Sequence, residues 1–327
     1  AGALEWGYAH AKADQTEVLA SLGVVFDTWY SERSMVDNGM IEAALDDLRE
    51  HGVVYENDGA TWLRSTDYGD DKDRVLIRSD GDFTYITPDI AYHRDKFERA
   101  DELIDVWGAA HHGYVGRMKA AMRSLGKDPD KLTVPITQMV RLMRGGDEVK
   151  LSKRTGDIIE LRDIVDEIGA DAARFTYLLQ SVDSPQTFDL ELAASKAMDN
   201  PVFYVQMAHA RLRSIQSKVA EAGIERQELA DTDLAPLAHE RELEVLRQLH
   251  EFPDIVTIAA RELAPHKVAN WLREFAAAVH GFYHDCYVMG DDIAPELTQA
   301  RLWLVEAARV GLVAGLTLVG VSAPDSM

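Results

Sequence analysis

The spacing of the apolar residues changes once along the chain, near residue 157, and this change limits the fold more than any other feature. Before it, helical patterns alternate with strand-like runs at residues 53–55, 60–63, 74–78, 83–86, 103–107 and 132–143. After it, strand signals are absent, and helical periods occupy residues 189–221, 239–251, 254–288 and 295–320, with breaks that include Pro253 and Pro295. The sequence therefore predicts an α/β part followed by an all-helical part.

Polar residues follow two of the predicted strands at the ends where α/β folds bind ligands. Thr87 is expected to cap a helix, which places Tyr85 and Asp89 between a strand end and the first helical turn. His111 and His112 follow the strand at residues 103–107. These four residues are ligand-binding candidates, and the alternative of core and helix-terminus roles stays open. Further along, Asp171 is expected to cap the helix that contains Leu179.

Composition excludes several classes of protein. The chain has 34 Lys and Arg against 56 Asp and Glu, a net charge of −22, which argues against coating nucleic acid by bulk charge but allows a local basic surface. The single cysteine, Cys286, excludes a disulfide framework, and with no metal-ligand spacing we expect no metal site. We expect a cytoplasmic location, since no signal peptide or sufficiently long apolar segment is visible. The Gly311–Gly315 spacing is interpreted as close helix packing.

One short basic segment carries a chemical pattern. Lys150 and Lys153 flank Ser152 on a loop that follows a strand-like run. Two ammonium groups at this spacing can neutralise the charge that develops on a polyphosphate in a transition state. A solvated basic turn is the alternative interpretation. Met139 and Val140, just before this loop, are candidates for an apolar wall beside an adenine ring, or else for core packing.

Residues 150–154, Lys-Leu-Ser-Lys-Arg, resemble the Lys-Met-Ser-Lys-Ser signature of class I aminoacyl-tRNA synthetases. Three other segments resemble arginyl-tRNA synthetases in particular. Residues 26–32 read Phe-Asp-Thr-Trp-Tyr-Ser-Glu, residues 85–89 read Tyr-Ile-Thr-Pro-Asp, and residues 200–211 look like the opening of the helical anticodon-binding domain. The tail at residues 318–327 is also similar to the end of that domain. The resemblance covers essentially the whole chain in the right order.

The resemblance implies a fold and a set of catalytic roles. The fold would be a partial doubly wound, Rossmann-type catalytic domain over residues 1–195 and a helical anticodon-binding bundle over residues 196–327. Lys150, Ser152 and Lys153 would be catalytic, with both lysines contacting ATP beside Met139 and Val140. Arginine would be bound by Tyr85 and Asp89, with His111 and His112 as further candidates. Trp29 and Glu32 are interpreted as structural.

The helical part is expected to bind RNA through local basic and aromatic groups. The candidates are Tyr204, Arg211, Phe282 and Tyr283, with Arg213, Lys218 and Trp303 as additional possibilities. A stripe of aromatic residues along a helix can equally belong to a core. Met207 stands where the family often has an aromatic residue, which removes one expected stacking contact.

The implied activity is the ATP-dependent ligation of arginine to its tRNA through arginyl-adenylate. ATP with its Mg²⁺, L-arginine and the arginine tRNA are the expected partners, with no membrane or DNA partner, and the chain is expected to be a monomer. The family's His-x-Gly-His signature is missing: residues 111–114 end in Tyr114, and Ala110 replaces an acidic residue. We therefore expect a C-terminal piece that is inactive alone. A non-enzymatic tRNA-binding fragment and a class I synthetase of other specificity are the alternatives.

Overall fold

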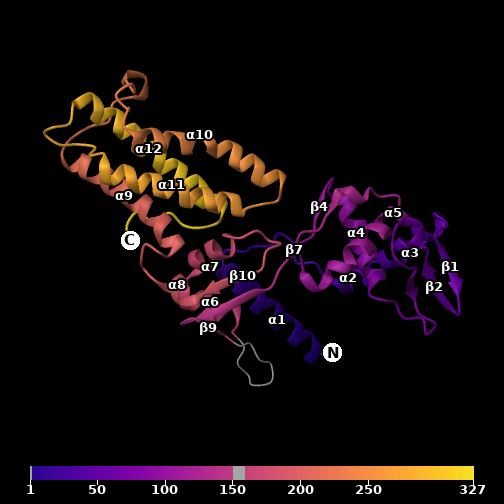
Figure 1. Cartoon of the computed structure of the whole chain (residues 1–327). Coiled ribbons are helices and arrows are strands. Elements are labelled where there is room, and N and C mark those ends of the chain that lie inside the picture. Colours follow the sequence, from indigo (N-terminus) through magenta and orange to yellow (C-terminus); the bar gives the residue numbers. More distant parts are fainter. Residues whose placement is uncertain (1, 150–158) are drawn as a thin grey trace. The chain divides into compact units, whose positions relative to one another are not determined.

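A computed structural model describes residues 2–149 and 159–327 of the chain (Figure 1). The chain divides into two compact units. The first unit contains Ala1–Val25, Val140–Ser181 and Pro185–Met327, and the second contains Phe26–Met139 with Val182–Ser184. The predicted order of an α/β part before an all-helical part is confirmed. The predicted boundary between residues 195 and 196 stays a prediction.

The second unit combines a small antiparallel sheet with helices and two short parallel strand pairs. The sheet has the order β1 (Val54–Asn57), β2 (Ala60–Leu63) and β3 (Arg74–Ile77). The parallel pairs are β4 (Leu103–Ile104) with β6 (Leu132–Thr133), and β5 (Trp107–Gly108) with β7 (Ile136–Thr137). The helices are α2 (Glu32–Asp37), α3 (Met40–Glu50), α4 (Ile86–Arg99) and α5 (Val115–Ser124), with 3-10 turns η1 (Ser65–Tyr68), η2 (Ala109–Tyr114) and η3 (Pro129–Lys131).

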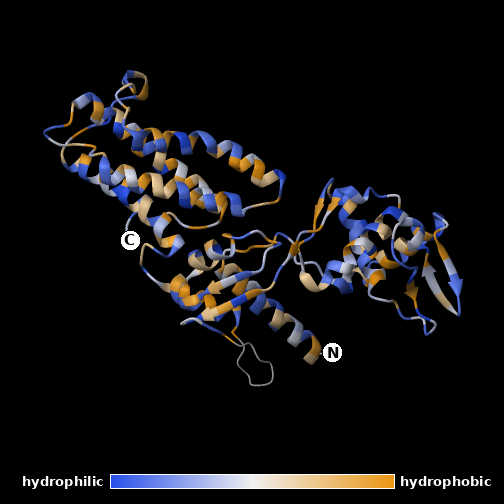
Figure 2. Cartoon of the chain, viewed as in Figure 1, coloured by the Kyte–Doolittle hydropathy of each residue, from blue (hydrophilic) through white to orange (hydrophobic). Residues whose placement is uncertain are grey.

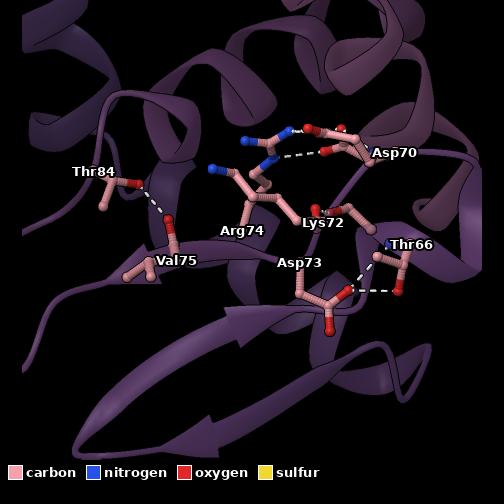
Figure 3. A network of polar contacts seen from close by, with 9 residues as sticks. Thr66, Asp70, Lys72, Asp73, Arg74, Val75 and Thr84 are labelled. Atoms are coloured by element: carbon pink, nitrogen blue, oxygen red, sulfur yellow. Dashed lines mark hydrogen bonds and ion pairs between the residues drawn. The ribbon is translucent and has the colours of Figure 1, made fainter.

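Polar side chains fix the segment between η1 and β3 (Figure 3). Oδ1 of Asp73 accepts hydrogen bonds from the backbone nitrogen of Thr66 at 3.1 Å and from its Oγ1 at 2.7 Å. Arg74 makes a forked ion pair with Asp70, with both N···O distances at 2.7 Å. A bidentate contact restricts the relative orientation of the two side chains. These bonds therefore fix the conformation of the loop that leads into β3, the strand that precedes α4.

The start of α4 differs from the prediction. Thr87 was expected as the helix cap after a strand at residues 83–86, but the helix already begins at Ile86, and only Phe83 forms a single bridge, to Ile77. Oγ1 of Thr87 donates to the carbonyl oxygen of Leu76 at 2.7 Å. The threonine therefore bonds the sheet instead of its own helix end, because the tertiary acceptor competes with the local cap.

The first unit contains a three-stranded sheet, several short helices and a bundle of long helices. The sheet has the order β10 (Gln186–Asp189), β8 (Val140–Arg144) and β9 (Asp147–Glu148), and β10 pairs with β8 in parallel. The elements outside the bundle are α1 (Gly2–Ser21), α6 (Leu161–Ile168), α7 (Ala170–Tyr177), α8 (Leu190–Ala194) and the 3-10 turn η4 (Leu229–Asp231). The bundle contains α9 (Pro201–Glu221), α10 (Glu240–Arg261), α11 (His266–Asp285) and α12 (Pro295–Leu318).

The bundle helices are amphipathic, with hydrophobic and hydrophilic residues interspersed along α9, α10 and α11 (Figure 2). Their buried faces form one core, which includes Phe275, Phe282 and Leu312. The close packing predicted at Gly311 and Gly315 is confirmed. A Cβ atom at Gly311 would lie 2.5 Å from Cδ2 of Leu249, and one at Gly315 would lie 2.7 Å from Cδ2 of Leu272.

Two strand predictions and one predicted helix break were wrong. Strand β10 was missed, and the strand-like run at residues 132–143 is divided among β6, β7 and β8. Pro253 lies inside α10 on its exposed side, where water can satisfy the carbonyl that a proline leaves unbonded. The helix ends instead at Arg261, and just beyond it Leu263, with a φ of 51°, reverses the chain while the nitrogen of Ala264 donates to the carbonyl oxygen of Ala259 at 2.8 Å.

Asp171 was expected to cap a helix, but the cap position of α7 is Gly169, and the carboxylate of Asp171 binds the C-terminal tail. Among the helices of the described ranges, none has both the length and the apolar character needed to cross a membrane.

Candidate functional site

A cavity of about 610 Å³ in the second unit contains the predicted pair Tyr85 and Asp89. We call it the carboxylate cavity. Its walls come from two stretches of chain, the loop leading into α2 and the start of α4, and its lining residues are Phe26, Thr28, Trp29, Tyr30, Glu32, Met35, Tyr85, Asp89 and Tyr92. Because one helical turn separates residues four apart, Tyr85 and Asp89 face the same space.

The lining combines negative charge with aromatic rings. Asp89 and Glu32 supply two carboxylates, and Tyr30 stacks on Tyr92 with ring centroids 4.3 Å apart. Tyr85 is 86% exposed, so both faces of its ring are accessible. Aromatic rings and carboxylates together are the groups that bind a flat organic cation such as a guanidinium. Trp29 and Glu32, interpreted as structural from the sequence, therefore belong to this candidate site.

Asp89 is held by a buried tyrosine. The hydroxyl of Tyr114 donates to Oδ2 of Asp89 at 2.7 Å. Burial, followed by this hydrogen bond, raises the pKa of Tyr114 well above its usual range, which keeps the hydroxyl protonated as a donor. Within the described residues Oδ1 of Asp89 has no hydrogen bond. Oδ1 can therefore accept from a donor that enters the cavity, and Glu32, also in the lining, is a second carboxylate there.

A buried polar cluster supports α4 behind the cavity. Ring nitrogen Nδ1 of His93 lies 2.7 Å from the backbone oxygen of Asp89, and its Nε2 lies 2.6 Å from Oδ2 of Asp105. Lys96 binds Oδ1 of Asp105 at 2.7 Å and lies 4.4 Å from the ring centroid of Tyr92. Burial raises the pKa of Asp105, but the hydrogen bonds from His93 and Lys96 outweigh it and lower that pKa overall. The cluster thus anchors both Asp89 and Tyr92.

Of the other predicted site residues that the structure describes, none lines this cavity. His111 and His112 lie on η2, directly after β5, and both are exposed and outside the cavity lining. Met139 is 77% exposed, and Val140 is the half-buried first residue of β8. Lys150, Ser152 and Lys153 lie outside the described residues. The roles of all these residues stay predictions.

A second cavity, of about 410 Å³, lies in the helical bundle. We call it the α9 cavity. Its rim is basic and aromatic and its floor is apolar, and its lining residues are Arg211, Ile215, Lys218, Val219, Tyr283, His284, Cys286, Tyr287, Val288 and Met289. Two of the predicted RNA-binding residues, Arg211 and Tyr283, meet here. Tyr287, which is 72% exposed, was missed because it lies beyond the end of α11, outside any helical stripe.

Arg211 is fixed in the α9 cavity by two contacts. Its guanidinium carbon lies 5.0 Å from the ring centroid of Tyr283, and Nη1 donates to Nδ1 of His280 at 2.9 Å. Nε2 of His280 in turn donates to the backbone oxygen of Tyr204 at 3.0 Å. Burial lowers the pKa of His280, which favours the neutral ring that can accept from Arg211. The arginine is therefore preorganised beside an aromatic ring.

The remaining predicted RNA-binding aromatics differ in accessibility. Phe282 is completely buried in the bundle core, so no face of its ring is open to a base. Tyr204 packs against His280 with ring centroids 4.5 Å apart and lines a separate cavity of about 470 Å³. Trp303 lies under the guanidinium of Arg226 at 4.1 Å. Within the described ranges, no group of three or more His, Cys, Asp or Glu residues could hold a metal ion.

Comparisons with known proteins agree with this division of sites. Residues 10–212 match the family of class I (R) tRNA synthetase catalytic domains, and residues 205–327 match the DALR anticodon binding domain. Because the first match covers more than half of the chain, the chain belongs to the class I aminoacyl-tRNA synthetases, within the arginyl-tRNA synthetase family. The resemblance stated from the sequence is thereby confirmed.

Individual relatives show the same relationship. The chain is 48% identical to arginine–tRNA ligase 1 of Halalkalibacterium halodurans over 310 residues, which are 94% of this chain and 55% of that protein. It is 46% identical to the arginine–tRNA ligase of Syntrophotalea carbinolica over 323 residues, which are 98% of this chain and 58% of that protein. The chain thus spans little more than half the length of these relatives.

Solved structures extend the comparison to the fold. A Campylobacter jejuni structure described as an arginyl tRNA synthetase has a TM-score of 0.90 at 33% identity, covering 99% of this chain and 69% of that chain. The Thermus thermophilus arginyl-tRNA synthetase has a TM-score of 0.78 at 23% identity, covering 100% of this chain and 65% of that chain, and this likeness concerns the fold alone.

Proposed function

We propose that this chain forms the amino-acid-side and anticodon-side parts of an enzyme that ligates arginine to its tRNA with ATP. In the first step, a carboxylate oxygen of arginine attacks the α-phosphorus of ATP, giving arginyl-adenylate and releasing pyrophosphate. In the second step, a terminal ribose hydroxyl of the tRNA takes the arginyl group and releases AMP. The carboxylate cavity, with Asp89 and Glu32 between aromatic rings, is the observation that carries the proposal.

Each predicted residue has a place in this reaction. Asp89 and Glu32 would accept hydrogen bonds from the guanidinium of arginine while Tyr85 covers one of its faces. Lys150 and Lys153, with Ser152, would neutralise phosphate charge as it redistributes. Met139 and Val140 would contact the adenine, and Mg²⁺ would arrive with ATP. His111 and His112 remain candidates for substrate contact.

Isotope-labelled chain titrated with arginine tests the amino-acid part. We expect saturable amide shifts around Tyr85 and Asp89 with arginine, and none with citrulline, because citrulline has the same shape but a neutral urea group. Equal responses to both compounds would show that the carboxylates do not select the guanidinium charge.

For the helical part, we propose that the α9 cavity receives an unpaired base of the arginine tRNA anticodon loop. A basic rim, tyrosine rings and an apolar floor suit a base that has left its stack. We expect Tyr287→Ala to weaken binding of the anticodon stem-loop, since stacking on one aromatic ring contributes about 1–3 kcal/mol per base. Tyr8→Ala, an exposed tyrosine on α1, is the matched control. Equal affinities for the two variants would place the loop elsewhere.

A non-enzymatic tRNA-binding role is the alternative that remains. It predicts stem-loop binding without any response to arginine, so the two titrations together distinguish it from the proposed ligase.

A further inference from the structure

The segment that follows α12 is bound to the rest of the bundle as far as Asp325. We call residues 319–327 the C-terminal strap. After α12 the chain turns at Gly320, which has a φ of 67°, and Val321 is buried in the bundle core. The strap then runs alongside α9 and α7, and both helices bind it through polar side chains.

Helix α9 binds the strap with three residues of one side. Nε2 of Gln206 donates to the backbone oxygen of Ser322 at 3.0 Å, and Nδ1 of His209 donates to that of Pro324 at 2.9 Å. Arg213 forms an ion pair with Asp325 at 2.9 Å. Residues three and four apart share a helix face. Gln206 and His209 are buried, so these contacts belong to the packed structure.

Helix α7 supplies the anchors. Oδ1 of Asp171 accepts from the backbone nitrogen of Ser322 at 3.1 Å, and its Oδ2 accepts from the hydroxyl of Ser322 and from Gln206. Arg174 donates from Nε to the carbonyl oxygen of Val319 at 3.3 Å and from Nη1 to that of Leu22 at 3.0 Å. One side chain therefore joins the end of α1, helix α7 and the strap.

Gly320 leaves the space that the side chain of Arg174, the second of the two α7 anchors, occupies. A Cβ atom at this position would lie 2.3 Å from Nη2 of Arg174. No other residue type leaves room for the guanidinium against the backbone there, and the positive φ also favours glycine. The glycine and the arginine form a matched pair.

The side of α9 opposite the strap faces the α9 cavity. Arg211, Ile215 and Lys218 line that cavity and are again four and three residues apart. With 3.6 residues per turn, this row lies on the far side of the helix from Gln206, His209 and Arg213. The strap therefore holds α9 from behind, and any movement of the strap changes the support of the cavity wall.

We infer that Asp171 and Arg174 are positioning residues for the α9 cavity: they anchor the C-terminal strap, and the strap fixes the helix that presents Arg211 and Lys218 to RNA. The role rests on the proposed binding of the anticodon loop. Helix α7 lies in the region that matches the catalytic domain, and the strap lies in the region that matches the anticodon-binding domain. The two anchors therefore connect these regions by hydrogen bonds between residues that are far apart in the sequence.

The test uses the whole 327-residue chain with Asp171→Ala, Arg174→Lys and the control Asp166→Ala, an exposed residue of α6. Hydrogen exchange of the Ser322 amide reports on the strap, and exchange in α11 reports on folding. We expect Asp171→Ala to expose the strap, leave α11 protected and weaken stem-loop binding about tenfold. Arg174→Lys, which keeps the charge but not the fork, should have a smaller effect, and Asp166→Ala none.

The salt dependence separates positioning from direct contact. Since neither variant removes a phosphate contact, the slope of affinity against salt should equal that of the wild type. Unchanged affinity with an exposed strap would overturn the inference, as would a strap that stays protected in Asp171→Ala. Failure of the wild-type chain to bind any stem-loop would instead contradict the proposed anticodon site, and the positioning role with it.

Discussion

Only one of the two carboxylate oxygens of Asp89 has a hydrogen-bond partner among the described residues. Tyr114 donates to Oδ2, the described residues give Oδ1 no hydrogen bond, and Asp89 lines the carboxylate cavity. This arrangement preorganises the carboxylate, since a side chain already held in place loses little rotamer freedom when a ligand binds. Under the proposed function the residue has a double role, as an acceptor for Tyr114 within the fold and as an acceptor for the guanidinium of arginine.

Asp89→Asn should weaken arginine binding strongly. The change removes the charge from a charge-assisted hydrogen bond, which contributes about 1.5–3 kcal/mol, so the dissociation constant should rise by about 10- to 150-fold. Calorimetric titration of the chain with arginine measures the effect, and Asp101→Asn, an exposed position, serves as the control. Wild-type affinity in Asp89→Asn would leave Asp89 only its bond to Tyr114.

His280 should make the bundle sensitive to acid. Burial lowers its pKa in the folded chain below the ordinary value of about 6.5. The unfolded chain therefore binds a proton more readily, and stability should fall as the pH drops below about 6.5 towards the lowered pKa. Thermal unfolding of the chain between pH 7.5 and 5 measures this loss. His280→Asn should lose less stability over the same interval, and an identical pH profile would contradict the assignment.

At the scale of elements, a buried ion pair joins three parts of the bundle. Nε of Arg301, on α12, lies 2.6 Å from Oε1 of Glu242, on α10, and both residues are buried. Oε2 of Glu242 also accepts from the backbone nitrogen of His239 at 2.8 Å, which completes a capping box at the start of α10. Arg301 further donates to the carbonyl oxygen of Tyr287, in the loop between α11 and α12.

Removing one partner of this pair should be costly. Arg301→Leu leaves the Glu242 carboxylate buried without a counter-charge, which should lower the free energy of unfolding by about 3–5 kcal/mol. Arg261→Leu is the matched control, because Arg261 pairs with Glu262 at the surface, where ion pairs contribute less than about 1 kcal/mol. Urea titrations of both variants measure the difference. Similar midpoints for the two variants would show that the buried pair has no special weight.

Elements with local signals were predictable from the sequence, and elements with tertiary causes were not. The sequence predicted Tyr85 and Asp89 at a strand end followed by a helix start. The helix start is confirmed and both residues line one cavity, but residues 83–86 form no strand. The contribution of Glu32 to the same cavity depends on packing between α2 and α4, which leaves no periodic trace. Pro253 was misinterpreted as a helix break, because the sequence did not show that it lies on the exposed side of α10. Asp171 was misinterpreted as a helix cap, because its actual partner, Ser322, is remote in sequence.

At the scale of the whole chain, the net charge limits how RNA can be bound. The net charge of −22 repels RNA at long range, so the proposed binding of RNA would depend on the few cations of the α9 cavity. We expect a shallow salt dependence, equivalent to two or three phosphate contacts at about 0.7–0.9 each. Binding of the anticodon stem-loop at several salt concentrations measures the slope. A slope several times steeper would mean that an extended basic surface makes the contact.

The chain alone should not catalyse arginine-dependent exchange between ATP and pyrophosphate. Its sequence has no His-x-Gly-His motif, and stabilisation of phosphate charge depends on preorganised groups from the whole nucleotide site. The exchange assay, with arginine tRNA present and a full-length relative as the positive control, tests this expectation. Sustained turnover by the 327-residue chain would contradict it.

The second unit is almost entirely one uninterrupted run of chain, Phe26–Met139, and every residue of the carboxylate cavity lies within that run. The first unit, in contrast, is assembled from stretches on either side of it. In terms of coding sequence, the carboxylate cavity is thus specified by one continuous stretch, whereas the strap, its anchors and the bundle are specified by the DNA on either side of it. Recombination at the two borders of this stretch would exchange the carboxylate cavity between relatives without altering a codon of the helical bundle.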